Sequence, residues 1–245
     1  MLQRLRELGR MANGWIFTNA TFLAARVELD PEAAARWLPG GVRLASPAVA
    51  TIFVAHYPET TFGSVYREAG VFLHVRRRMR AAVHCPWMIV DDDIALILGR
   101  ELLGYPKKIG EISLHIDGDA VEATAQRKGA RLLRLRGTLG AADPSPPPML
   151  AQRTYNVWGG VGLSLQRLIA FTPTEQILGA RRADLSIEIG EAVNDPLDQL
   201  GVGRVLSAHL YRVNIGGGGF PWGTPRPVRR VSPGFMLRNW ALRYQ

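Results

Sequence analysis

The sequence predicts a mainly β or α+β fold, in which many short strands are joined by turns and accompanied by a few short helices. Runs of β-branched and aromatic residues recur along the 245-residue chain, and clusters of glycine and proline separate them. Hydrophobic residues make up 47% of the chain, which is enough for a substantial core. We expect a single domain over residues 1–245, in which residues 216–245 form an irregular C-terminal tail.

The expected elements follow one another along the chain. Residues 15–28 are rich in β-branched and aromatic residues and predict one or two strands. Asp30 and Pro31 precede several alanines, which predicts a short helix with Asp30 as its N-cap and Pro31 in its first turn. Residues 49–56 and 94–99 are continuous apolar runs, typical of strands buried on both faces. Further strands are expected over residues 71–79, 112–125, 132–139, 185–189 and 205–215.

The formal net charge of +9 favours anionic partners such as acidic metabolites, although the simpler interpretation is a basic surface that aids solubility. The basic clusters at 76–80 and 226–230 lack interleaved aromatic residues, so we do not expect nucleic-acid binding. No segment approaches the ~20 apolar residues of a membrane span, and residues 1–13 lack a signal peptide's apolar segment. We therefore expect a cytoplasmic protein with no membrane partner.

Metal-ligating patterns are weak. Cys85 is the one cysteine, which excludes a disulfide within the chain and is typical of a reducing compartment. The five histidines are scattered without ligand spacing. Residues 91–93 are three aspartates that cannot all point one way from a strand, so a polar turn is the better interpretation. We expect no metal site, and we expect the glycine run at 216–219 to be a loop rather than a phosphate-binding motif.

The most informative motif is GYPKKIG at residues 104–110. Adjacent lysines are usually solvated, but an apolar run precedes this pair and glycine and proline flank it, so we expect at least one lysine to turn inward. A lysine attacks a carbonyl only as a neutral amine, and its ordinary pKa of about 10.4 leaves almost none at pH 7. Desolvation by Leu103 and Tyr105, and the like charge of Lys108, would both lower the pKa of Lys107. Lys107 is therefore a candidate nucleophile.

The sequence around these lysines resembles a known family. Residues 99–110, GRELLGYPKKIG, are similar to the GRE-x-x-x-YPKK-x-G signature of the acetoacetate decarboxylase family. Residues 65–70 resemble the family's Tyr-x-Glu-x-Gly segment, and residues 196–200 with the strand at 205–215 resemble a late family segment. The resemblance extends over roughly residues 15–215. It implies an acetoacetate decarboxylase-like β-barrel with a few short helices, and a homo-oligomeric lyase whose strands enclose an apolar pocket.

The resemblance also implies roles for individual residues. Lys107 corresponds to the Schiff-base lysine, and acetoacetate decarboxylase is the standard example of a lysine activated by its surroundings. Lys108 either lowers the pKa of Lys107 or anchors the loop. Glu68 is the candidate acid and base, although a surface ion pair with Arg67 is its alternative. Arg100 either holds a substrate carboxylate or forms an internal ion pair. The expected substrate-binding residues are Arg100, Tyr105 and Leu103.

Two departures from the family pattern bear on the substrate. The family's early Asn-Arg-x-Tyr/Phe segment corresponds to residues 19–22, where Ala20 replaces the arginine. A second family glutamate falls at or near Ile52, in a strand that carries no acid. We therefore expect a more apolar pocket and a substrate other than acetoacetate.

The function that follows is decarboxylation of an oxo acid, a β-keto acid, through a Schiff base on Lys107. No cofactor is expected, because the iminium formed on Lys107 itself accepts the electrons of the bond that breaks when CO₂ leaves. One alternative is an aldolase-dehydratase that acts on oxo acids through the same Schiff base, with Tyr211 or Tyr244 assisting. A second alternative is a non-catalytic ligand-binding barrel, in which Lys107 can be replaced without loss of ligand affinity.

Overall fold

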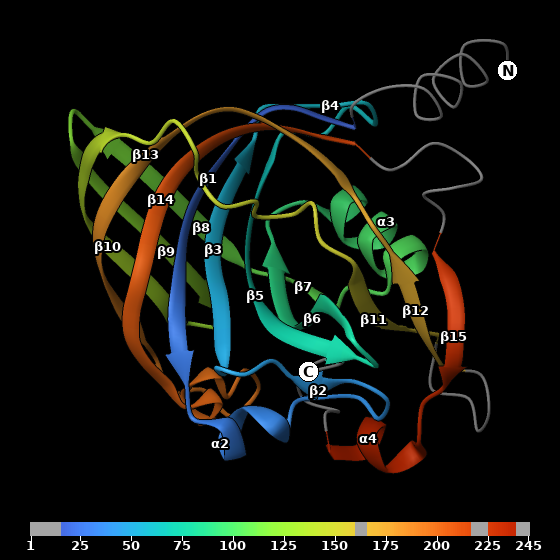
Figure 1. Ribbon diagram of the computed structural model, residues 1–245. Helices are drawn as coiled ribbons and strands as arrows, with labels where there is room; N and C mark the ends of the chain where they lie inside the picture. The colour runs from blue at the N-terminus through green and yellow to red at the C-terminus, as the bar shows by residue number, and fades with distance from the viewer. Residues whose placement is uncertain (1–15, 160–165, 217–224, 239–245) are drawn as a thin grey trace, which may run out of the picture.

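The computed structural model describes residues 16–159, 166–216 and 225–238, and within them the strands join into one large sheet (Figure 1). This confirms the mainly β class that the sequence predicts. The strands are β1 (Phe17–Leu29), β2 (Arg43–Leu44), β3 (Val49–Tyr57), β4 (Glu59–Thr60), β5 (Tyr66–Arg77), β6 (Arg80–Val90), β7 (Lys107–Ile109), β8 (Glu111–Asp117), β9 (Ala120–Arg127), β10 (Ala130–Ala142), β11 (Thr154–Trp158), β12 (Arg167–Phe171), β13 (Thr174–Ile189), β14 (Val202–Gly216) and β15 (Arg226–Arg230).

The helices are few and short. None of those described is both long and apolar enough to cross a membrane. They are α2 (Pro31–Ala35), α3 (Asp93–Leu103), α4 (Pro233–Arg238) and the 3₁₀ turn η1 (Leu197–Leu200).

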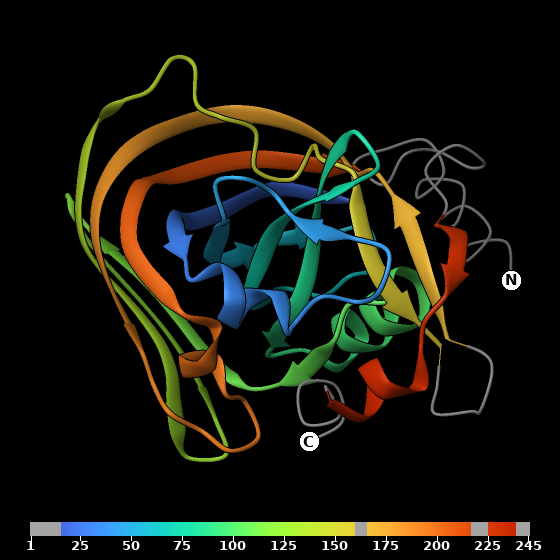
Figure 2. The same ribbon diagram turned by 60° about the horizontal axis from the view of Figure 1, so that its bottom comes forward.

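The sheet is strongly curled. Its strand order is β15-β12-β11-β6-β5-β3-β1-β14-β13-β10-β9-β8, with β2, β4 and β7 attached to β5, β1 and β6. Neighbouring strands are antiparallel except at β6, which pairs in parallel with both β7 and β11. Strands β8 and β9 fold back to contact β3, while β11, β12 and α3 lie on the other side of the molecule (Figure 1, Figure 2). The central strands β1, β3 and β5 are therefore covered on both faces.

Two hydrophobic clusters lie on the two faces of these central strands. Along β1, Leu23 belongs to the first cluster and Phe22 to the second, as expected from the alternation of side chains in a strand. The first cluster fills the space between the central strands and β8–β10. The second contains Phe53, Phe72 and Tyr105, and it continues toward α3. The candidate functional residues lie beside this second cluster.

Several predicted elements are confirmed. The segment 15–28 corresponds to β1, and the apolar run 49–56 is β3, whose residues are almost all buried. The short helix α2 begins after Asp30, whose Oδ1 accepts hydrogen bonds from the backbone amides of Glu32 and Ala33 at 2.8 and 3.3 Å. Aspartate at this position satisfies amides that have no partner within the helix.

The prediction of a strand over residues 94–99 is wrong, because this run forms the first half of α3. The helix starts at a cap: Oδ1 of Asp92 accepts a hydrogen bond from the amide of Ala95 at 2.7 Å. It ends at Gly104, which adopts the left-handed conformation with φ of 64°. Both the exposed and the buried face of α3 carry apolar residues over this run, for example Ile97 and Ala95. The run therefore lacks the alternation of polar and apolar residues that indicates a helix.

Two further segments differ from expectation. Residues 112–125 form two strands, β8 and β9, because the chain turns at Gly118, where φ is 57°. The tail over 216–245, expected to be irregular, contains β15 and α4 among its described residues. Strand β15 pairs with β12, which the sequence analysis did not foresee. The glycine run at 217–219 and the segment 1–13 lie outside the described residues.

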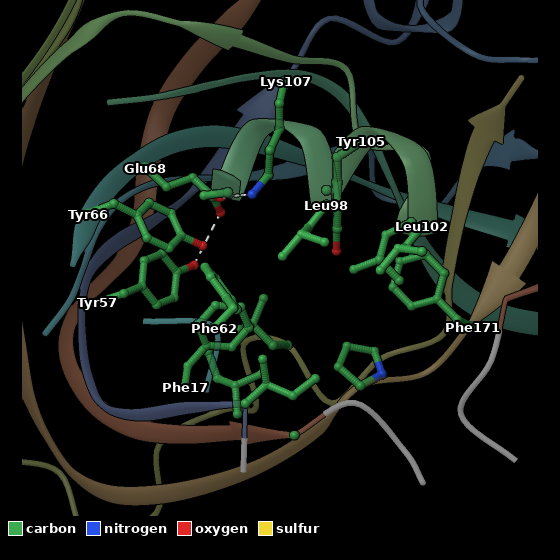
Figure 3. A pocket seen from close by; sticks show the side chains of 18 of the residues that line it. Phe17, Tyr57, Phe62, Tyr66, Glu68, Leu98, Leu102, Tyr105, Lys107 and Phe171 are labelled. Carbon is green, nitrogen blue, oxygen red and sulfur yellow. Dashed lines mark hydrogen bonds and ion pairs between the residues drawn. The ribbon is translucent and has the colours of Figure 1, made fainter. Parts of the chain in front are cut away.

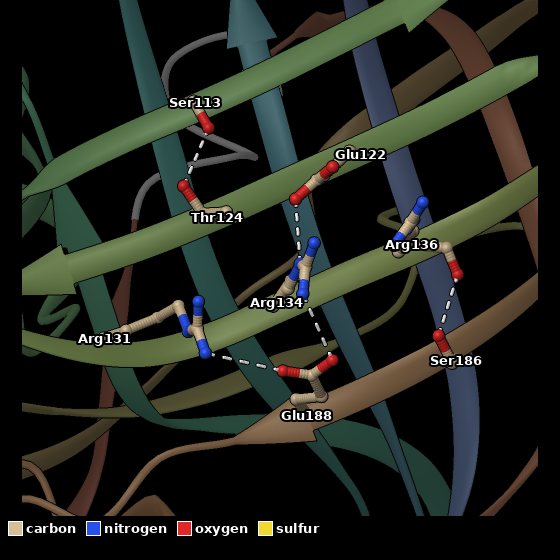
Figure 4. Close-up of polar contacts among 8 residues, drawn as sticks. All are labelled: Ser113, Glu122, Thr124, Arg131, Arg134, Arg136, Ser186 and Glu188. Atoms are coloured by element: carbon tan, nitrogen blue, oxygen red, sulfur yellow. Dashed lines mark hydrogen bonds and ion pairs between the residues drawn. The ribbon is translucent and has the colours of Figure 1, made fainter.

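The outward face of β8, β9, β10 and β13 carries a polar ladder that crosses the strands (Figure 4). Arg134 lies between two carboxylates, 2.8 Å from Glu122 and 3.4 Å from Glu188. Ser113 and Thr124 share a hydrogen bond of 2.7 Å between β8 and β9. Part of the chain's basic charge is therefore held in solvent-facing ion pairs.

Candidate active site

The two adjacent lysines lie on the short strand β7. Its parallel pairing with β6 places Lys107 beside Met88 and Lys108 beside Ile89. Successive side chains of a strand point to opposite faces, and both lysines are only 5% exposed. One lysine is therefore buried on each face of β7, and each needs a partner for its charge.

Lys107 forms a buried ion pair with Glu68 of β5. Its Nζ lies 2.7 Å from Oε2 of Glu68, and both side chains are 6% exposed. The other carboxylate oxygen, Oε1, accepts a hydrogen bond of 3.1 Å from the hydroxyl of Tyr57 on β3. The same Nζ lies 5.4 Å from the ring centre of Tyr66 and 5.9 Å from that of Tyr105. The amine thus lies in a polar corner formed by the Glu68 carboxylate and the hydroxyls of Tyr57 and Tyr66, while the hydroxyl of Tyr105 points away toward Leu102 (Figure 3).

Lys108 has different partners. Its Nζ forms an ion pair with Asp195, and it donates a hydrogen bond of 2.9 Å to the carbonyl of Asn194. Asp195 also accepts hydrogen bonds from Trp87 Nε1 and Arg127 Nη1, both at 2.8 Å. Burial lowers the pKa of Lys108, while its hydrogen bond with Asp195 acts in the opposite direction. The amine of Lys108 is therefore held by partners on the face of β7 opposite to Lys107.

Arg100 is placed differently from the expected carboxylate contact. It lies in α3, and its Nη1 donates a hydrogen bond of 2.9 Å to the backbone carbonyl of Lys107. It is not among the residues that line the cavity described below. Its guanidinium instead connects the helix to β7, so it supports the backbone from which Lys107 projects.

Lys107 and Glu68 line a cavity of about 170 Å³ between the central strands and α3. Tyr105 and Leu103, both expected at the substrate site, line it too. Away from the polar corner, most of its walls are hydrocarbon and aromatic, with Thr172 and the hydroxyl of Tyr105 among them. The residues of these walls include Phe17, Phe62, Leu98, Leu102, Leu103 and Phe171 (Figure 3).

The phenols of the site are neutral at physiological pH. Burial raises the pKa of Tyr57, Tyr66 and Tyr105 well above the ordinary value of a phenol, and the charge of Glu68 adds to this effect. These hydroxyls are therefore hydrogen-bond donors, and the Glu68 carboxylate is the acceptor that Tyr57 uses.

The departures from the family pattern can now be located. Ala20 is fully buried in the second cluster. Ile52 belongs to the first cluster, on the face of β3 that points away from Lys107. The second-cluster positions beside it on β3 are Phe53 and Ala55, which are equally apolar. The cavity lining is mostly apolar, and Ile52 itself takes no part in it.

Several residues of the site were not expected from the sequence, among them Tyr57 and Gly99. Tyr57 is directly opposite Tyr66 in the β3–β5 pairing, and its hydroxyl reaches Glu68. Its position at the end of the apolar run 49–56 gave no signal of this contact, which depends on strand register. Gly99, part of the GRE motif, packs against the side chain of Lys107 and was noted only as a motif residue.

Tyr211, considered above as an assisting residue, lies elsewhere. Its hydroxyl donates a hydrogen bond of 3.2 Å to the carbonyl of Pro147, and it lines a second cavity with His74 and His209. Tyr244 is outside the described residues. Within the described part of the chain, no group of three or more His, Cys, Asp or Glu side chains is arranged to hold a metal ion.

Comparisons with known proteins agree with this architecture. The family model described as acetoacetate decarboxylase (ADC) matches residues 7–226. The acetoacetate decarboxylase of Chromobacterium violaceum is 28% identical over 207 residues, which are 80% of this chain and 82% of that protein.

Solved structures show the same fold. Acetoacetate decarboxylase from Legionella pneumophila has a TM-score of 0.76 at 17% identity, covering 87% of this chain and 86% of that one. The enduracididine biosynthesis enzyme MppR, complexed with pyruvate, has a TM-score of 0.74 at 17% identity and covers 85% and 88%. Another MppR structure holds the condensation product of pyruvate and imidazole 4-carboxaldehyde. The predicted acetoacetate decarboxylase-like fold is thereby confirmed.

Proposed function

The chain belongs to the acetoacetate decarboxylase family, and on that premise we propose that it is a lyase that decarboxylates a β-oxo acid through a Schiff base on Lys107. The observation that carries the proposal is the buried contact of 2.7 Å between Lys107 Nζ and Glu68 Oε2 at the wall of a cavity. A nucleophile, a proton acceptor and space for a substrate meet at this one place.

The first half of the reaction forms the iminium. Lys107 must lose a proton before it attacks, and Glu68 is in position to accept it. The amine nitrogen then bonds to the substrate's carbonyl carbon, and the carbonyl oxygen takes up protons and leaves as water. The product is a positively charged iminium beside the Glu68 carboxylate, which stabilises that charge.

The second half releases carbon dioxide. The electrons of the bond to the substrate's carboxylate move into the iminium, so that CO₂ leaves and an enamine remains. A protonated Glu68 returns a proton to the enamine carbon, and water hydrolyses the resulting iminium to a ketone and free Lys107. One proton is consumed from solvent in each turnover. The iminium is the electron sink, so the proposed reaction calls for no cofactor.

The remaining residues have supporting roles in this proposal. Lys108 anchors β7 through Asp195, and Arg100 braces the same strand through the Lys107 carbonyl. Tyr105 and Leu103 contact the substrate from the cavity wall. From the family resemblance we further propose a single-domain, cytoplasmic homo-oligomer, which light scattering on the purified protein and cell fractionation would test.

A second candidate function uses the same iminium. Loss of an α-proton, rather than CO₂, gives an enamine that attacks an aldehyde, and dehydration follows. The observation that favours it is the likeness to MppR, one structure of which holds the condensation product of pyruvate and an aldehyde. A ligand-binding barrel without catalysis is the third possibility, and the experiment below separates all three.

The test is intact-protein mass spectrometry after borohydride reduction with acetoacetate, pyruvate and longer β-oxo acids, with CO₂ release measured in the same samples. The chain offers a control at another lysine, because Lys128 is exposed in the turn between β9 and β10. We expect a covalent adduct on the native protein and on Lys128→Gln, none on Lys107→Ala, and CO₂ with a β-oxo acid. An adduct without CO₂ would favour the condensation reaction, and no adduct with any acid would favour the binding barrel.

A further inference from the structure

A second cavity, of about 280 Å³, lies on the same face of the central strands as the Lys107 cavity but toward their opposite end. Along β5, Glu68 lines the first cavity and His74 lines the second. Phe72, between them on this strand, belongs to the second hydrophobic cluster. The described residues that line the two cavities are entirely different. The second cavity is therefore a separate place in the fold, and the proposed reaction makes no use of it.

The floor of this cavity is polar because of the register of three neighbouring strands. Arg26 of β1 is directly opposite Thr51 of β3 and Ser207 of β14. Two residues earlier on β1, Ala24 is opposite His209 of β14. Alternate residues of a strand share a face, and all five of these residues line the cavity. The small side chain of Ala24 leaves open space among the polar groups.

The segment 147–152 forms the opposite wall and is held in place. The carbonyl of Pro147 accepts a hydrogen bond of 3.2 Å from the hydroxyl of Tyr211. Oε2 of Glu175 accepts hydrogen bonds of 3.1 to 3.2 Å from the backbone amides of residues 149–151. The cavity is thus already formed without a ligand, as most small-molecule sites are.

The lining carries a permanent positive charge. Among the described lining residues, Arg26 is the one lysine or arginine, and none is a carboxylate. Asp143 lies outside the lining and forms ion pairs with His209 and Arg182, at 3.0 and 3.4 Å. Burial lowers the pKa of His74 to about 4, and the charge of Arg26 adds to this effect. His74 is therefore neutral at physiological pH, and its ring both donates and accepts hydrogen bonds.

These features match one class of ligand. Arg26 is exposed, so its guanidinium lies at the mouth of the cavity, where it can bind a carboxylate through two parallel hydrogen bonds. Further in, the hydroxyls of Thr51 and Ser207 and the imidazole of His74 can bond to hydroxyl groups of the same ligand. We propose that this cavity binds a small hydroxylated carboxylic acid, such as an aldonic acid, at a site distinct from Lys107.

The volume and the charge of the cavity set limits on this acid. A cavity of about 150 Å³ in another protein holds one benzene molecule, so about 280 Å³ has room for an acid of about ten non-hydrogen atoms. A phosphate ester carries close to two negative charges at neutral pH and needs several converging donors or cations. The described lining offers Arg26 alone as a permanent cation, which matches the single charge of a carboxylate.

The experiment is isothermal titration calorimetry of L-threonate into the full-length protein, with three comparison ligands. L-Threitol keeps the hydroxyls without the carboxylate, pentanoate keeps the carboxylate without the hydroxyls, and glycerol 3-phosphate carries a phosphate instead. We expect L-threonate to bind at least about tenfold more tightly than each of them, because it alone pairs with Arg26 and fills the polar interior. All titrations are repeated with Lys107→Ala, which removes the cation of the first cavity and should leave the affinity for L-threonate unchanged.

Variants of the lining test the individual contacts. Arg26→Gln changes an exposed residue, so the fold should be kept, and it should weaken L-threonate binding at least about tenfold. Ser207→Ala removes one hydroxyl, so it should weaken L-threonate binding about fivefold and leave pentanoate binding unchanged. Arg212→Gln is the control, because Arg212 is exposed on β14 and does not line the cavity.

The outcomes that would overturn the proposal are distinct. Absence of L-threonate binding would do so, and so would its loss in Lys107→Ala, which would place the acid in the first cavity. Native affinity in Arg26→Gln, or equal affinities for L-threonate and L-threitol, would rule out a carboxylate at Arg26. Tighter binding of glycerol 3-phosphate would rule out the carboxylate class. Equal losses in Arg26→Gln and Arg212→Gln would show that general surface charge attracts the acid.

Discussion

Gly99 lies directly against the side chain of Lys107. A Cβ atom at residue 99 would be 2.5 Å from Cε and 3.0 Å from Nζ of Lys107, which is closer than real side chains approach. A side chain at this position of α3 would therefore have to displace the end of the Lys107 side chain. The absence of a side chain at this position gives Lys107 its room beside Glu68.

The substitution Gly99→Ala should therefore separate stability from activity. Alanine favours a helix over glycine by up to about 1 kcal/mol, so the fold should be kept. Lys107 must move, however, and a misplacement of about 1 Å can slow a reaction about a hundredfold. We expect the rate of borohydride-trapped adduct formation to fall at least about tenfold. Gly179→Ala is the control, because a Cβ there meets nothing within 4 Å; equal rates in the two variants would contradict the packing argument.

Tyr57→Phe removes the hydroxyl that donates to Glu68 and leaves the ion pair with Lys107 in place. Hydrogen bonds to charged groups contribute about 1.5–3 kcal/mol, so we expect CO₂ release to slow by about tenfold to a hundredfold. Adduct formation should change less, because Lys107 keeps its position. Tyr155→Phe, at a buried tyrosine of the first cluster, serves as the control. The role assigned to Tyr57 fails if both variants release CO₂ at the native rate.

Asp195 should be a strong determinant of stability. Its side chain is 2% exposed. Its carboxylate forms ion pairs with Lys108 and Arg127 and accepts a hydrogen bond from the indole of Trp87. Removal of one partner from a buried ion pair costs about 3–5 kcal/mol, because the remaining charges lose their compensation. We expect a decrease of this size in the free energy of unfolding of Asp195→Ala, measured by urea titration.

A surface pair gives the contrast for that measurement. Glu28 and Arg204 form an ion pair with side chains that are 42% and 75% exposed. Water screens such pairs, so Glu28→Gln should leave the free energy of unfolding unchanged within error. Comparable losses in Asp195→Ala and Glu28→Gln would refute the anchoring role of Asp195.

The stability of the protein should also depend on pH through His74. Burial, with the charge of Arg26 adding to it, lowers the pKa of His74 to about 4. Between pH 6.5 and 4 the unfolded chain therefore binds a proton that the folded chain does not. The free energy of unfolding decreases as the pH falls through this window, by up to about 3 kcal/mol.

Urea titrations at pH 7 and pH 4.5 would measure this effect. His74→Gln should lose less stability than the native protein on acidification, because glutamine does not titrate. His115→Gln, at an exposed position of β8, should follow the native protein. Parallel losses in the native protein and His74→Gln would show that other groups cause the acid sensitivity.

Most of the strands could be predicted because the pattern of apolar residues within each segment is itself typical of a strand. The segment 49–56 is apolar along its whole length because β3 is covered on both faces, and that pattern is typical of a buried strand. The same pattern misled the prediction at 94–99, which forms α3. Only the cap at Asp92 and the turn at Gly104 distinguish that segment as a helix, and both signals lie outside the apolar run.

Part of the candidate site was predictable in its residues, but its geometry was not. The motif around Lys107 and the resemblance at Glu68 indicated two side chains that the structure brings to 2.7 Å. The partners of Arg100 and Lys108 could not be read from the sequence, because they depend on tertiary packing. Asp195 is distant in the chain from Lys108, and it reaches the lysine through the loop before η1.

The two lysines are buried on opposite faces of β7, and this constrains how β7 can be aligned with β6. A slip of one residue would present Lys108 to Glu68, and the chemistry of the amine would be unchanged, since the two side chains are identical. The same slip would present Ile109 to Asp195, leaving a buried carboxylate beside hydrocarbon. Asp195 thereby makes two chemically equivalent residues distinguishable, and it determines which of them faces Glu68 and the cavity.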